Sequence, residues 1–175
     1  MKKIAFLLMA APSLVFAAGN TISFRGQVSD QTCQISVDGA SSALVLLPTV
    51  AKSVLSSDGK VAGETPFTVS VSGCSASSST SVPVKTTFAV SSSTSGGNIV
   101  NVGSATNVSL QLLDKSGGNA VRLVGGAPSS VSGLVLPSGS GGTASQVFAV
   151  RYVAEGGAAT AGSVIGSVQY SLDYL

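Results

Sequence analysis

The sequence contains no histidine and no tryptophan, and only 9% of its 175 residues are charged. Without histidine, the Ser-His-Asp and Cys-His arrangements of nucleophilic enzymes are excluded. The seven carboxylates are scattered along the chain, so none is paired for acid and base catalysis or grouped as a metal cage. We therefore predict that the chain is not an enzyme and has no catalytic residue, no metal site, no cofactor and no small-molecule substrate.

Two short strings match catalytic or nucleotide-binding motifs but lack the context that those motifs need. Ser57–Lys60 fits the S-x-x-K string of acyl enzymes, yet the supporting S-D-N and K-T-G strings are absent. Gly139–Ala144 fits a loose dinucleotide pattern, but the strand-like Gln146–Val150 follows it where a phosphate-binding helix would be needed. We interpret the first string as a turn and the second as a flexible loop.

Residues 1–17 have the three parts of a secretory signal peptide. Lys2 and Lys3 precede the apolar run Ile4–Ala11, and the small-residue end Val15–Ala17 follows it. A membrane anchor is the alternative, but the run is shorter than the roughly 20 apolar residues that span a bilayer. We predict export, with the mature chain beginning at Ala18.

The mature chain is long enough for one domain and has no net charge, because the signal takes two of the nine basic residues and leaves seven against seven acidic ones. This balance does not favour nucleic acid or an anionic membrane as a partner. A chain with so few charges has little to keep it monomeric, which suits a subunit that lives inside an assembly.

Cys33 and Cys74 are the only cysteines. An even number in an exported chain favours one disulfide over free or metal-binding thiols. Closing a loop of about 40 residues would stabilise the fold by roughly 4 kcal/mol on the chain-entropy model.

Short runs of Val, Leu, Phe and Thr with period two, separated by Gly, Ser, Asn and Pro, predict an all-β domain of the sandwich type. Asp38-Gly39 is a good tight turn, and only Val50–Leu55 could form a turn of helix. The segments that we expect to be strands are Thr21–Val37, Leu44–Val50, Pro66–Val71, Val82–Val90, Asn107–Leu113, Ala120–Val124, Val131–Leu136, Gln146–Ala154 and Ser163–Tyr174.

The end of the chain alternates strictly between two faces. One face carries Val164, Gly166, Val168, Tyr170, Leu172 and Tyr174. This period predicts a half-buried terminal strand, which on its own is equally typical of the last strand of any sandwich.

The start of the mature chain alternates too, with Ile22, Phe24, Gly26 and Val28 on one face. A strand so close to a terminus is free to pair outside its own domain, although it could equally be the first strand of that domain.

Both ends together resemble the pilins of the type 1 fimbrial superfamily. The similarity rests on the penultimate Tyr174, on Gly162 fourteen residues from the end, on the spacing of Cys33 and Cys74, and on Phe24-Arg25-Gly26. Asp30–Cys33 and Thr65–Phe67 also look like the corresponding segments of major shaft subunits, so the resemblance covers the whole mature chain.

The resemblance implies an incomplete immunoglobulin-like β-sandwich that lacks its seventh strand, with an apolar groove beside the C-terminal strand. Residues 18–31 would form an N-terminal extension and residues 32–175 the pilin domain. A periplasmic chaperone would fill the groove first, and the extension of the next identical or homologous subunit would replace it at an outer-membrane usher. The implied donor strand carries Ile22, Phe24, Gly26 and Val28; the implied groove and chaperone-recognition strand carries Gly162, Val164, Gly166, Val168, Tyr170, Leu172 and Tyr174.

The function implied is that of a structural subunit of an adhesive surface pilus. A minor adaptor of the same fibre is the nearest alternative, and a free-standing secreted lectin-like sandwich is a more distant one. With no Trp and three Tyr, the chain has little material for an aromatic sugar platform.

Overall fold

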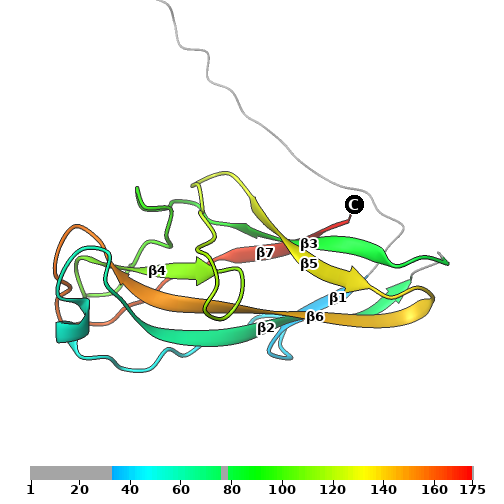
Figure 1. Ribbon diagram of the computed structural model, residues 1–175, viewed down its shortest axis with the longest axis horizontal. Coiled ribbons are helices and arrows are strands. Elements are labelled where there is room, and N and C mark those ends of the chain that lie inside the picture. Colours follow the sequence, from blue (N-terminus) through cyan, green and yellow to red (C-terminus); the bar gives the residue numbers. More distant parts are fainter. Residues whose placement is uncertain (1–32, 76–78, 175) are drawn as a thin grey trace, which may run out of the picture.

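The computed structural model describes residues 33–75 and 79–174, and these form an all-β sandwich of two sheets (Figure 1). The predicted fold class is confirmed. The predicted signal peptide and N-terminal extension lie outside the described residues. The strands are β1 (Gln34–Val37), β2 (Val61–Ser75), β3 (Val82–Ala89), β4 (Val108–Leu113), β5 (Ser129–Leu136), β6 (Ser140–Ala154) and β7 (Gln169–Tyr174).

The two sheets differ in size and are antiparallel throughout. The larger has the strand order β1-β2-β6-β4 and the smaller has the order β5-β3-β7. Within the part of the chain that the structure describes, β7 is therefore an edge strand that pairs with β3 alone. Among the described residues, no helix is long and apolar enough to cross a membrane.

Side chains that alternate along the strands fill the space between the sheets. In β3, Val84, Thr86 and Phe88 are fully buried, while the residues between them are half-buried on the outer face. The rings of Phe88 and Phe148, which come from opposite sheets, meet edge to face with their centroids 5.0 Å apart. Such aromatic pairs add about 0.5–1.5 kcal/mol to the stabilisation from buried area, so this contact helps to hold the two layers together.

Two predicted turns are confirmed. Asp38 and Gly39 have positive φ values of 47° and 82°, and the backbone bonds between Val37 and Ala40 close the turn. Lys52–Leu55 forms one turn of 3-10 helix, η1, inside the segment for which a helical turn was predicted.

β2 and β6 are 15 residues long, and each begins earlier than predicted. Gly63 and Gly73 lie in β2 with φ of 66° and 64°, next to irregularities in its pairing with β6. Glycine adopts these conformations without steric cost, so the strand continues past residues that a sequence pattern interprets as turns.

The predicted strands Leu44–Val50 and Ala120–Val124 are wrong, because neither joins a ladder. Residues 43–50 have no regular secondary structure, and none of residues 42–50 has a hydrogen bond to another described residue. In Ala120–Val124, only the two end residues form isolated β-bridges among the described residues, Ala120 with Leu113 and Val124 with Ala127. Alternation reports which side chains are buried, whereas a strand also needs a neighbouring backbone to pair with.

Candidate functional site

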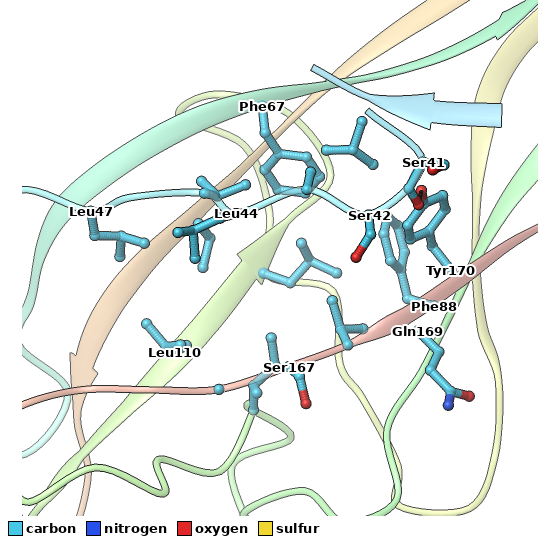
Figure 2. Close-up of a pocket in the computed structure, with 18 of the residues that line it drawn as sticks. Ser41, Ser42, Leu44, Leu47, Phe67, Phe88, Leu110, Ser167, Gln169 and Tyr170 are labelled. Atoms are coloured by element: carbon cyan, nitrogen blue, oxygen red, sulfur yellow. Dashed lines mark hydrogen bonds between the residues drawn. The ribbon is translucent and has the colours of Figure 1, made fainter. Parts of the chain in front are cut away.

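An apolar groove of about 750 Å³ opens between the extended segment 41–47 and residues 166–170, which lead into β7 (Figure 2). The two walls run in opposite directions, with Leu47 at one end of the first wall and Ser41 at the other. The floor comes from both sheets and consists of Ile35, Val37, Phe67, Phe88, Ile99, Leu110, Leu112 and Val150. Among the described residues, no charged side chain lines the groove, so a ligand that fills it must present apolar groups.

The wall that leads into β7 has the alternation predicted for the C-terminal segment, although the strand begins at Gln169 and not at Ser163 as predicted. Val164, Gly166, Val168 and Tyr170 are half-buried, whereas Ile165, Ser167 and Gln169 between them are exposed. A Cβ atom on Gly166 would come within 2.8 Å of Ile99 Cγ2 and 2.9 Å of Leu110 Cδ1, so the backbone here lies directly on the floor.

The seven residues predicted for this strand lie in four places. Gly166, Val168 and Tyr170 line the groove. Leu172 and Tyr174 lie further along β7 and pack against the cluster around Cys74. Val164 packs both against the cluster around Leu55 and against the core cluster that supplies the groove floor. Gly162 lies on the backbone of Ala105, where a Cβ would approach the Ala105 nitrogen to 2.5 Å.

The opposite wall was not predicted as part of a site. Along residues 44–47 the exposure alternates: Leu44 is 82% and Leu46 is 76% exposed, while Val45 and Leu47 pack against the core. The sequence signal for this wall was the alternation that also suggested a strand. The floor residues Phe67, Ile99 and Leu110 come from distant positions, and no local pattern marks them.

Both walls carry backbone groups that have no partner among the described residues. Within that part of the chain β7 has no strand on its outer edge, and segment 42–50 makes no hydrogen bond. Buried or half-buried backbone groups of this kind are normally paired, so each wall is an open template for a further strand.

Two tyrosines of β7 join it to the chain on either side of β1. The Tyr170 hydroxyl donates a hydrogen bond of 2.8 Å to the Ser41 carbonyl oxygen. Burial raises the pKa of the Tyr174 phenol, and a hydrogen bond with the Cys33 backbone acts in the opposite direction. These two tyrosines thus connect β7 to the segments that flank β1, at the end of the groove that Tyr170 lines.

The predicted disulfide between Cys33 and Cys74 is confirmed, with the two Cα atoms 4.2 Å apart. It ties the residue before β1 to the end of β2, in a cluster with Leu134, Leu136 and Tyr174. The described residues contain no group of three His, Cys, Asp or Glu side chains that could hold a metal ion.

The predicted donor residues Ile22, Phe24, Gly26 and Val28 lie outside the described residues. The structure therefore supplies a groove and its walls, and the sequence supplies a candidate segment to fill it.

Residues 22–175 match the family model described as "Fimbrial protein". The chain is 37% identical to the major fimbrial subunit SMF-1 of Stenotrophomonas maltophilia over 174 residues, which cover 96% of this chain and 99% of that one. It is 35% identical to the F17 fimbrial protein of Escherichia coli, with 99% of each chain covered. Among solved structures, a subunit of a chaperone-usher pilus matches 94% of this chain and 100% of its own, with a TM-score of 0.59 and 17% identity.

Proposed function

The chain belongs to the fimbrial protein family and is a structural pilin subunit; from this premise we propose that its groove receives the N-terminal strand of a second copy. Repeating this contact from one subunit to the next builds an adhesive surface fibre. The role is structural, with no catalytic step, no cofactor and no small-molecule substrate.

The observation that carries this proposal is the pair of unpaired extended walls over an apolar floor. A single extended segment between them could bond to both walls through its backbone and place alternate side chains on the floor. The sandwich would then be complete, and two template edges would be covered.

The segment that fits is residues 18–31 of the neighbouring subunit. Ile22, Phe24, Gly26 and Val28 alternate on one face and are uncharged, as the groove lining is. Burying the three apolar side chains at roughly 1.5–3 kcal/mol each would contribute on the order of 5–9 kcal/mol. That is large enough to drive assembly without an external energy source.

The open apolar groove also bears on how the subunit is exported. We propose that residues 1–17 are removed as a signal peptide and that residues 32–175 fold as the pilin domain in the periplasm. An empty apolar groove with open edges favours aggregation. A periplasmic chaperone therefore covers it until an outer-membrane usher exchanges the chaperone for the next subunit, which brings the fibre to the cell surface.

The experiment that tests the proposal is the substitution Gly26→Leu. Gly26 lies between Phe24 and Val28 on the inward face, so a leucine there would strike the groove floor and prevent insertion. We expect the variant to fold with its chaperone but to give no polymer ladder in size-exclusion chromatography and electrophoresis. Gln27→Leu is the matched control, because Gln27 faces outward in the same strand. Normal polymerisation of Gly26→Leu would contradict the proposal.

A second prediction concerns the C-terminal strand. We propose that Leu172 and Tyr174 belong to the strand that the chaperone recognises and that the terminal carboxylate helps to anchor it. Deleting residues 173–175 should abolish chaperone capture in a pull-down assay and send the subunit to proteolysis. Ser171→Ala, an exposed change on the same strand, serves as the control. Undiminished fibre yield from the truncated chain would count against this role.

A further inference from the structure

Tyr170 lies across one end of the groove. Its ring is part of the groove lining, and its hydroxyl reaches the carbonyl oxygen of Ser41 on the opposite wall at 2.8 Å (Figure 2). This solvent-exposed bond joins residues 129 positions apart in the sequence. In the described part of the chain it is the only hydrogen bond between segment 41–47 and residues 166–173.

The groove is shorter than the strand that has to enter it. On the β7 side it is lined from Gly166 to Tyr170, and four residue steps of an extended chain span about 13 Å. A donor with inward side chains at residues 22, 24, 26 and 28 covers six steps, or about 20 Å. A donor that seats all four positions must therefore extend past one end of the groove.

The chain is held together by different numbers of bonds at the two ends of the groove, so a donor strand could extend past one end more easily than past the other. Beyond Gly166, Val164 packs against a cluster that contains the buried residues Leu55, Ala105 and Val108. The backbone of residues 163–165 is also bonded to residues 101–105, for example through Val102 N–H to the Ile165 carbonyl at 2.8 Å. At the other end, Leu172 also packs against a buried cluster, the one around Cys74, but one hydrogen bond from Tyr170 joins the two walls there. Opening a single exposed hydrogen bond disrupts less than breaking the several bonds that hold residues 163–165 to residues 101–105.

We propose that the bond between Tyr170 and Ser41 is a latch that closes the empty groove and opens when the donor strand of a second copy seats its fourth side chain. The inference rests on the proposed function, since the occupant is residues 20–30 of another subunit. With the latch open, the groove extends along β7 to Leu172, six residue steps from Gly166. Tyr170 is thus a positioning residue that controls how readily the last part of the donor enters.

The test is the rate at which synthetic donor peptides bind the full mature chain. The acceptor chain carries Gly26→Leu, so that its own N-terminal strand does not compete. The long peptide has residues 20–30 with all four inward positions; the short peptide has residues 23–29 with only three, which fit within the closed groove. Binding of each labelled peptide is followed by fluorescence anisotropy in acceptors with Tyr170, with Tyr170→Phe and with Tyr152→Phe. The last is the matched control, because Tyr152 is half-buried in β6 and does not line the groove.

Removing the Tyr170 hydroxyl should speed association of the long peptide about two- to ten-fold, the factor that corresponds to the net value of one hydrogen bond. The short peptide should bind at the same rate to all three acceptors, and dissociation of the long peptide should not change. An unchanged or slower long-peptide rate in Tyr170→Phe would overturn the latch, and so would equal acceleration of both peptides. If neither peptide binds the acceptor that retains Tyr170, the proposed function itself fails and the latch falls with it.

Discussion

A chain whose own donor segment follows its C-terminus should be more stable by roughly 5–9 kcal/mol than the chain that lacks the segment. The change consists of deleting residues 18–28 and appending residues 20–30 after Leu175 through a short flexible linker. β7 ends at Tyr174 beside the unpaired edge, so a tight turn would return the appended segment along that edge. Its Ile22, Phe24 and Val28 side chains would then cover the groove floor.

Urea unfolding of the two chains, followed by circular dichroism, gives the difference in free energy directly. The appended chain should also remain monomeric without its chaperone. A matched control carries Phe24→Ser in the appended segment, which removes the largest apolar side chain and should lose a large part of the gain. If the appended chain is no more resistant to denaturant than the chain lacking residues 18–28, the assignment of the donor strand is wrong.

Loss of the disulfide should have the next largest effect, a decrease of roughly 4 kcal/mol in the free energy of unfolding of Cys33→Ser. The bond constrains a loop of 41 residues in the unfolded chain and holds the start of β1 to the end of β2. Domains of this size are stable by only about 5–15 kcal/mol, so the amount of pilin recovered should fall sharply.

Denaturant unfolding of the purified variant measures the decrease, and immunoblotting of the periplasm measures recovery. The double variant Cys33→Ser/Cys74→Ser is the control, because it loses the same bond without leaving a reactive thiol at residue 74. The two variants should lose similar stability. Alkylation of both thiols in unreduced fibres, detected by mass spectrometry, would refute a structural role for the bond.

Much of the site on β7 could be predicted because alternation is a local property of a strand. Val164, Val168 and Tyr170 face inward in the structure, as period two requires, and Ile165 faces outward. The disulfide could also be predicted from the sequence, because the chain has two cysteines and an even number in an exported chain favours a bond between them.

The other wall shows where this reasoning stops. Leu44–Val50 has the same period as a strand, and Val45 and Leu47 are indeed half-buried, yet the segment has no ladder partner. Whether a segment pairs as a strand depends on whether another strand lies beside it, and the groove lies beside this segment instead. The early start of β2 was missed for a different reason, because Gly63 forms an irregularity inside the strand and interrupts the period-two pattern.

The sequence by itself determined the all-β class, the inward face of the C-terminal strand, the disulfide and a donor-like segment at the other end of the chain. These depend on composition and on spacing between near neighbours, which carry the period of a strand directly. Only the tertiary structure decided that the groove floor combines Phe67, Ile99 and Leu110 and that Tyr170 meets Ser41 across it. Contacts between such distant residues depend on the order in which strands pair within two sheets, and no local pattern encodes that order.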